Sequence, residues 1–147
     1  MITEATAILK VAHDLWSLIT GADKALRERK QQENAENLAQ RGRAADYFIN
    51  IAEVLEHASA QLKQKAFPSG SCAQLLAHAH VLPDMLAGVV GASDLAGLQS
   101  RLFAAHHVEH LHAQVSEVSD PVEITSRLSE LDASAGVFRA IAAQLRL

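Results

Sequence analysis

The side chains best suited to chemistry gather in one short segment, which runs His-His-Val-Glu-His-Leu-His over positions 106 to 112. On a helix, residues four apart lie one turn apart on the same face, so His106 and His110 can hold one metal ion together. Glu109 and His112 have the Glu-x-x-His spacing that di-iron helical bundles use. The spacing therefore makes these four residues the candidate ligands of a metal site.

A simpler interpretation of this segment is a row of solvated histidines. Di-iron bundles use the Glu-x-x-His pair twice and add glutamates from two other helices, whereas the sequence shows no second copy. His13, Glu53 and His57 are candidates from neighbouring helices, but nothing in the sequence brings them together. Because imidazole titrates near about pH 6.5, a pH-sensing cluster is a further alternative. The sequence favours solvated histidines and predicts no cofactor.

Cys72, the single cysteine of the chain, is the other reactive side chain. It follows Ser69, Gly70 and Ser71 near an expected helix start, where the helix dipole lowers a thiol pKa and favours a nucleophilic thiolate. Against this, Cys72 continues an apolar stripe, and free cysteines are commonly buried. No base or oxyanion site can be assigned beside it. We therefore expect a structural cysteine and a protein that is not an enzyme.

The elements that position these residues are predicted to be helices, because apolar residues recur at spacings of three and four and almost never alternate. The first segment, residues 2–19, carries two adjacent apolar ridges and only a narrow polar face. Its helix is therefore either central in the bundle or keeps a face for a membrane or a partner protein. The predicted face consists of Ile8, Val11, Leu15, Trp16 and Leu18.

The rest of the chain divides into further helices. Residues 22–43 are polar and rich in helix formers, which predicts a polar helix or a flexible connection. A helix with a heptad-like apolar stripe follows to about residue 65, and Pro83 predicts a kink or a split in the helix that begins near residue 71. A continuous apolar stripe predicts one helix over 95–118, which would contain the histidine segment.

The last helix has the clearest start signal in the sequence. Asp120 can cap it, Pro121 suits its first position, and Glu123 is placed to complete a capping box. Its apolar stripe continues almost to Leu147. Taken together, the segments predict an all-α fold, an antiparallel bundle of four to five helices with a kinked or split middle helix. Residues 1–147 are expected to form one domain of ordinary size.

Composition narrows the partners and the compartment. A net charge of −4 and 4% aromatic residues argue against nucleic acid. Charged residues interrupt the longest apolar region at Glu4, Lys10 and Asp14, so a membrane span is not expected. The N-terminus lacks the pattern of a signal peptide. These features predict a cytoplasmic protein, with recruitment to the inner membrane face as an alternative, and they identify no small-molecule substrate.

Three features give the chain a broader resemblance: the apolar first segment ILKVAHDLWSLITG, the polar connection after it, and a helical remainder that includes FPSGSCAQLLAHA and LPDMLAGVVG. Their order resembles the helical amino-terminal modules of bacterial and fungal cell-death or immune signalling proteins, known as HeLo-like or Bell-type bundles. The resemblance implies self-assembly triggered by a larger sensor, and a first helix that is released into membranes. Lys10 and Asp14 depart from that expectation, because they interrupt the apolar first helix.

The leading hypothesis is a non-enzymatic helical bundle that acts through protein–protein contacts, as an oligomerising signalling module in bacterial defence or as an adaptor. Apolar stripes are abundant, whereas paired carboxylates, phosphate-binding glycines and nucleophile–base sets are missing. One alternative is a membrane-active cell-death effector whose first helix leaves the bundle and enters lipid. The other is a metal-binding bundle that uses the histidine segment.

Overall fold

The computed structural model describes residues 3–27 and 35–147, and these fold as helices joined by short connections. Apart from an isolated bridge between Ala87 and Val90, the described residues form no β-structure, which confirms the predicted all-α class. The helices are α1 (Glu4–Arg27), α2 (Ala35–Lys63), α3 (Ser69–Leu86), α4 (Ala92–Ala105), the 3-10 turn η2 (Val108–His110), α5 (Leu111–Ser116), α6 (Pro121–Arg127) and α7 (Ser129–Leu145).

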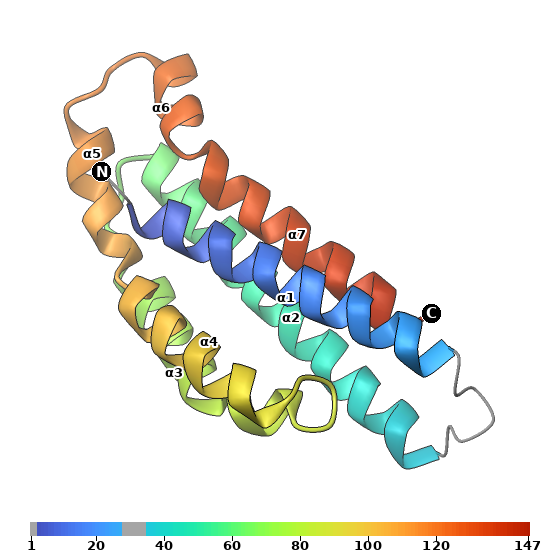
Figure 1. Ribbon diagram of the computed structural model, residues 1–147. Helices are drawn as coiled ribbons and strands as arrows, with labels where there is room; N and C mark the ends of the chain where they lie inside the picture. Colours follow the sequence, from blue (N-terminus) through green and yellow to red (C-terminus); the bar gives the residue numbers. More distant parts are fainter. Residues whose placement is uncertain (1–2, 28–34) are drawn as a thin grey trace.

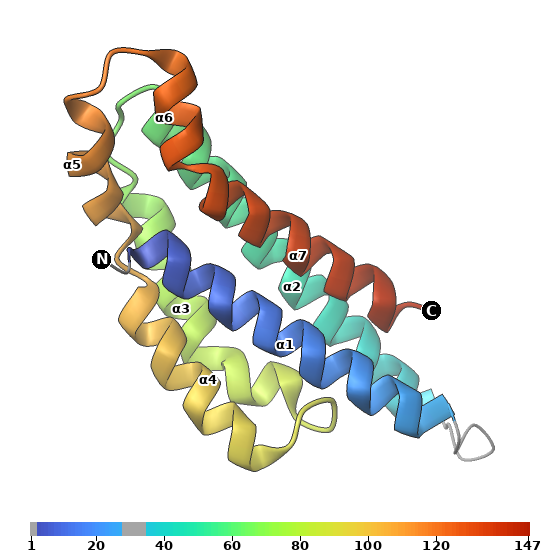
Figure 2. The same ribbon diagram turned by 45° about the horizontal axis from the view of Figure 1, so that its top comes forward.

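The five long helices form a closed ring (Figure 1). Helix α1 packs between α7 and α4, α2 packs between α7 and α3, and α3 and α4 pack on each other. The turned view in Figure 2 shows the same order, with the short helices α5 and α6 at one end of the bundle. Neighbours in the ring run antiparallel except α1 and α7, which run in the same direction. Because the ring has five helices, chain direction cannot alternate at every contact, and one neighbouring pair must run parallel.

One continuous hydrophobic core fills this ring, and its aromatic centre lies between α2 and α7. The rings of Phe48 and Phe138 stack there with centroids 5.8 Å apart, and both side chains are fully buried. At the surface of the same interface, Arg139 donates two hydrogen bonds to the Glu56 carboxylate, at 3.0 and 2.6 Å. The Arg139 guanidinium thereby holds the pKa of Glu56 below its usual value.

His78 on α3 should make the stability of this core depend on pH. Its ring is half-buried and packs edge-on against Tyr47, at 5.5 Å between centroids, and burial lowers its pKa from the usual 6.5. The unfolded chain then binds more protons than the folded one below about pH 6.5, so stability falls with falling pH. Urea denaturation between about pH 7.5 and about pH 5.5 should show a smaller decline for His78→Gln than for wild type or for the exposed-site control His57→Gln. Equal declines in all three proteins would contradict this assignment.

Helix α3 is not split at Pro83, one of the two outcomes that the sequence predicts there, because it continues through Pro83 to Leu86. A proline inside a helix leaves the carbonyl four residues earlier without its usual amide donor. Here that carbonyl belongs to Ala79, and the side chain of Gln99 on α4 donates to it at 3.1 Å and to His80 O at 3.3 Å. A tertiary contact thus replaces the missing helical hydrogen bond and also ties α4 to α3.

Two predicted helices are instead divided. The helix expected over 95–118 ends as α4 at Ala105 and resumes through η2 and α5, and the expected last helix is interrupted at Leu128, between α6 and α7. Buried Ile124 and Leu128 continue the apolar stripe across that second break. The apolar pattern therefore predicts which residues are buried, but it does not predict where a helix is interrupted.

The predicted cap of the last helix is confirmed at Asp120, whose Oδ1 accepts a hydrogen bond from the amide of Val122 at 3.1 Å. Pro121 occupies the first turn as expected. The Glu123 carboxylate, predicted to complete a capping box, accepts a hydrogen bond from Arg127 one turn later, at 2.9 Å. The cap therefore fixes where α6 begins, and the ion pair lies along its exposed side.

The polar segment predicted over 22–43 is helical wherever the structure describes it. Helix α1 extends beyond the predicted apolar segment to Arg27, and α2 begins at Ala35. Residues 28–34, on which the choice between helix and flexible connection depends, lie outside the described part of the chain. Among the helices that are described, none combines the length and the apolar character that crossing a bilayer requires.

Candidate functional site

The histidine segment lies at a break between helices, so His106 and His110 do not share one helical face as predicted. The backbone of His107 (φ −76°, ψ 55°) forms an inverse γ-turn in which the amide of Val108 donates to His106 O at 2.8 Å. The His106 side chain stabilises the end of α4, because its Nδ1 donates to Phe103 O. The rings of His106, His107 and His110 lie close together at this break. The ring centroids of His106 and His107 are 3.9 Å apart, and those of His107 and His110 are 5.1 Å apart.

This arrangement brings together two overlapping groups of side chains of the types that can bind a metal ion. One ligand atom from each of Cys72, His106 and His107 lies within 4.8 Å of the other two, and the same holds for His107, Glu109 and His110. Cys72 reaches the break from the first turn of α3, which packs against η2. Three of the four residues predicted from the helical spacing, His106, Glu109 and His110, therefore belong to this cluster.

His112, the fourth predicted ligand, lies apart from both groups. Its Nε2 donates to Lys65 O at 3.1 Å, and its ring packs edge-on against Phe67. His13 and His57 are exposed and join neither group either. Sequence reasoning did not identify Cys72 and His107 as possible metal ligands, because helical spacing placed His107 on another face and gave no sign that α3 approaches the break.

Glu109 controls the electrostatics of the cluster. Its Oε1 accepts a hydrogen bond from His107 Nδ1 at 3.0 Å, whereas its Oε2 is buried without a hydrogen-bond partner among the described residues. Burial would raise the pKa of Glu109, but contacts with the Cys72 thiol, its own backbone amide and His107 hold that pKa below its usual value. Conversely, burial and the adjacent Glu109 carboxylate raise the pKa of Cys72 to about 12. The thiolate that the helix dipole was expected to favour is therefore disfavoured.

The cluster is also tied to the beginning of α1. His110 Nδ1 donates to Glu4 Oε1 at 3.0 Å, which connects the first turn of α1 to the break after α4. Both partners keep contact with solvent, since the His110 side chain is 59% exposed. The pair therefore fixes the His110 ring without removing it from water.

The predicted membrane or partner face of the first helix divides into two parts in the folded bundle. Ile8, Val11 and Leu15 are at most 1% exposed and lie in the core. Trp16 and Leu18 are half-buried and pack against the edge of the core. Contact of the first three with lipid or a partner therefore requires α1 to leave the bundle, whereas Leu18 can be reached in the folded state.

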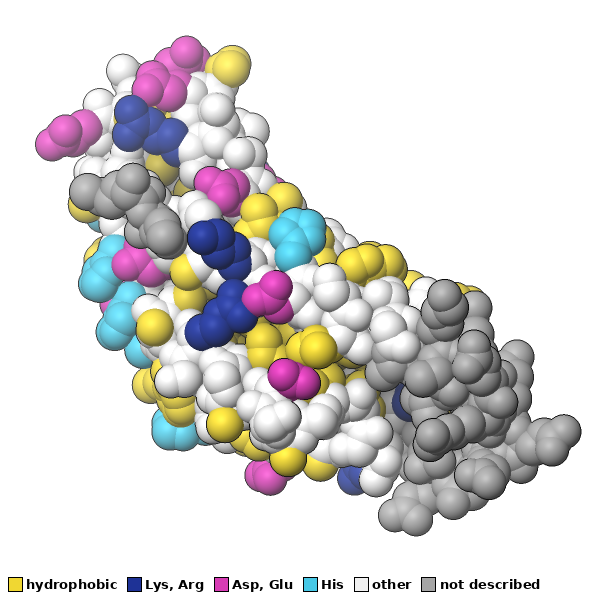
Figure 3. All heavy atoms as spheres, viewed as in Figure 1, with side chains coloured by type: hydrophobic (Ala, Val, Ile, Leu, Met, Phe, Trp, Pro, Cys, Tyr) yellow, Lys and Arg dark blue, Asp and Glu magenta, His cyan; other side chains and the backbone are white. Residues whose placement is uncertain are grey.

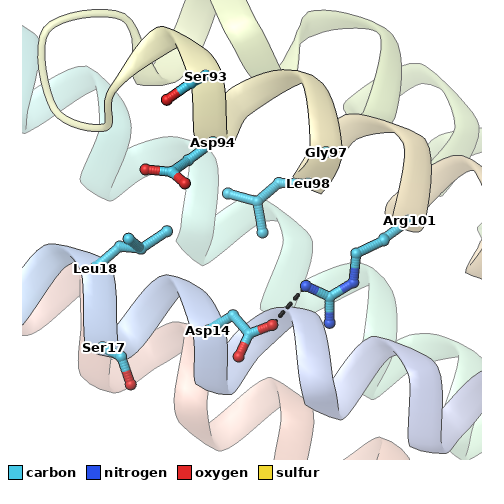
Figure 4. A pocket seen from close by; sticks show the side chains of 8 residues that line it. All are labelled: Asp14, Ser17, Leu18, Ser93, Asp94, Gly97, Leu98 and Arg101. Atoms are coloured by element: carbon cyan, nitrogen blue, oxygen red, sulfur yellow. Dashed lines mark hydrogen bonds and ion pairs between the residues drawn. The ribbon is translucent and has the colours of Figure 1, made fainter.

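Leu18 lines an open groove between α1 and α4, with a volume of about 390 Å³. Figure 3 shows apolar side chains at the surface between these helices, bordered by charged ones. The close-up in Figure 4 shows Leu18 and Leu98 extending into the groove from opposite helices, with Asp94 beside them. At one end Arg101 donates to the Asp14 carboxylate at 2.5 Å and so closes the groove there.

The comparisons with known proteins do not narrow the class further than the fold does. Models of protein families, curated proteins and solved structures give no match to this chain. The class established here is an all-helical bundle with two candidate sites, one at the break after α4 and one in the groove between α1 and α4.

Proposed function

We propose that this bundle is a non-enzymatic protein-interaction module that receives an amphipathic helix of a partner protein in the groove between α1 and α4. The observation that carries the proposal is the groove itself, which has apolar side chains from two helices and a charged rim. Its volume of about 390 Å³ is within the range of about 300–1,000 Å³ that binding pockets occupy. One or two apolar anchors of a docked helix can fill such a space.

At Gly97, which has no side chain, a bound group can come close to the backbone of α4. A Cβ placed on Gly97 would meet no atom within 4 Å, so the space above it is open. Glycine within a helix costs about 1 kcal/mol relative to alanine, and here it leaves the α4 backbone uncovered where it lines the groove. An apolar side chain of a partner helix fits this position.

Charge complementarity specifies the partner further. Asp94 lies on the groove rim and has no ion-pair partner among the described residues, whereas Asp14 is paired with Arg101. A helix with an apolar ridge and a lysine or arginine beside it would pair with Asp94 when its ridge fills the groove. The proposed partner segment is therefore amphipathic and basic.

The finer role in cell-death or immune signalling remains our proposal from the resemblance to HeLo-like and Bell-type modules. The order of an apolar first helix, a polar connection and a helical remainder supports it. In this proposal the groove receives a helix of the sensor or of another copy, while α1 remains in the bundle. Residues Ile8, Val11 and Leu15 would then serve the core rather than a membrane.

A matched pair of glycine variants tests the groove. Gly97→Met fills it, whereas Gly136→Met makes the same change on α7, where an added Cβ also meets nothing within 4 Å. The probe is a fluorescent helical peptide with a leucine ridge flanked by lysines, and its binding is measured by fluorescence anisotropy. We expect wild type and Gly136→Met to bind it equally, and Gly97→Met to bind at least about 10-fold more weakly, about 1.4 kcal/mol.

The charge requirement is tested with the same peptide carrying glutamates in place of the lysines. Wild type should bind the acidic peptide more weakly than the basic one, and Asp94→Asn should reduce that difference. Equal binding by Gly97→Met and Gly136→Met, or no preference for the basic peptide, contradicts the proposal. Sedimentation without peptide tests self-association. If the wild-type protein self-associates and Gly97→Met does not, the groove is occupied by a second copy rather than by a separate partner.

A further inference from the structure

We propose that Cys72, His106 and His107 form a zinc-binding site that joins the first turn of α3 to the end of α4. Their ligand atoms already lie within 4.8 Å of one another, from two segments more than thirty positions apart in the sequence. One thiolate and two imidazoles are a ligand set that suits zinc, because zinc binds both sulfur and nitrogen. The site is independent of the groove between α1 and α4.

The hydrogen bonds at the break leave one nitrogen, Nε2, of each imidazole available. Phe103 O can only accept, so His106 Nδ1 carries the proton and its Nε2 keeps a lone pair. The ionised Glu109 carboxylate likewise accepts from His107 Nδ1, at 3.0 Å, which leaves His107 Nε2 free to bind. Metal-binding histidines typically donate their other N–H to a backbone carbonyl or a carboxylate. Both histidines already have this arrangement.

The remaining adjustment is small. With Zn–S near about 2.3 Å and Zn–N near about 2.0 Å, tetrahedral ligand atoms lie about 3.5 Å apart. Side-chain movements of about 1 Å bring a spacing of at most 4.8 Å to that value. Cys72 and His106 are half-buried and His107 is more exposed, so the site can be reached from solvent. Three protein ligands leave a fourth position for water or another ligand.

Glu109 supplies the independent indication that a cation belongs here. Its Oε2 is buried and forms no well-aligned hydrogen bond among the described residues, with the Cys72 thiol and the backbone amide of Glu109 beside the carboxylate. Its other oxygen orients His107, one of the proposed ligands. A bound Zn²⁺ next to this carboxylate would balance its buried negative charge. We therefore assign Glu109 as a positioning residue outside the ligand set.

The second group, His107, Glu109 and His110, fits zinc less well. It contains no thiolate, and two of its members, His107 and Glu109, already form a hydrogen bond with each other. The His110 side chain is more exposed than that of His107, and its Nδ1 donates a hydrogen bond to the Glu4 carboxylate. We therefore place the ion on the side of Cys72 and not on the side of His110.

The experiment uses the full chain without a polyhistidine tag and cobalt(II) as a spectroscopic substitute for zinc. We expect one equivalent of cobalt(II) to give a thiolate-to-cobalt charge-transfer band and the visible bands of a tetrahedral site, both abolished by added zinc. Cys72→Ser should lose the charge-transfer band. Loss of a residue that only orients a ligand weakens metal binding by about 10- to 100-fold. We expect a larger loss of cobalt(II) affinity in each of the three ligand variants, Cys72→Ser, His106→Gln and His107→Gln.

His112→Gln is the matched control, because His112 lies in the same segment but outside the cluster. It should bind cobalt(II) like wild type. Circular dichroism confirms the helical content of each variant, and Cys72→Ala replaces Cys72→Ser if the latter does not fold. The proposal is wrong if folded wild type binds no cobalt(II), or if the charge-transfer band is absent. It is also wrong if His110→Gln abolishes binding while Cys72→Ser retains it, because the ion would then occupy the second group.

Discussion

Phe138→Ala is expected to lower the free energy of unfolding by about 3–5 kcal/mol. Phe138 on α7 is fully buried and stacks on Phe48 of α2 across the most extensive helix contact in the bundle. Removing the ring leaves a cavity where several helices meet, and the surrounding side chains can fill it only partly. Because small domains are stable by about 5–15 kcal/mol in total, this one change should remove a large share of the stability.

Urea denaturation followed by circular dichroism measures this loss, and Phe67→Ala is its control. Phe67 is 55% exposed and touches the ring of His112 at the surface. The same truncation there should change the free energy of unfolding by no more than about 0.5 kcal/mol. Similar losses for the two variants would mean that the core between α2 and α7 is not packed as described.

Leu15→Glu is expected to leave the protein largely unfolded at room temperature. Leu15 is 1% exposed, so losing its apolar contacts costs about 2–5 kcal/mol. A buried carboxyl group without a hydrogen-bond partner adds about 1–3 kcal/mol. The sum approaches the whole stability of a small domain. Circular dichroism and thermal unfolding should therefore show little cooperative structure.

The control for Leu15→Glu is His13→Glu, which introduces the same group at an exposed position of α1. It should fold and unfold like wild type, within about 0.5 kcal/mol. A folded, cooperative Leu15→Glu protein would place this face of α1 outside the core. The comparison also bears on the membrane alternative, because a loss of lipid damage in Leu15→Glu would reflect unfolding as readily as a lost lipid contact.

The fold could be predicted in outline because apolar periodicity records which face of each segment is buried. The stripe through Ala105, Val108, Leu111 and Val115 is buried as expected, although the helix that carries it is interrupted at His107. Such breaks depend on local hydrogen bonds that periodicity does not encode. At Pro83, by contrast, the helix continues where the local sequence favours an interruption. Gln99 of another helix donates to the carbonyl that lacks its amide partner, and no local signal could show that contact.

The candidate sites were predictable only in part for the same reason. The histidine segment marked the region of the cluster, but the approach of Cys72 follows from the packing of α3 on η2. The apolar first helix suggested a binding face, yet only Trp16 and Leu18 keep partial exposure. The groove also needs Gly97 and Leu98 of α4, which are distant in the sequence. Pairings between segments far apart in the chain are what a single sequence conceals.

The central claim, that the folded bundle binds a basic amphipathic helix between α1 and α4, is tested most directly by NMR. The measurement is a titration of the ¹⁵N-labelled protein with the lysine-flanked peptide, following backbone amide shifts. We predict changes concentrated in the segments 14–18 and 93–101, which contain the residues that line the groove, with the signals of the buried part of α1 retained. Changes centred on α2 and α7, or loss of the folded α1 signals on binding, would contradict the claim.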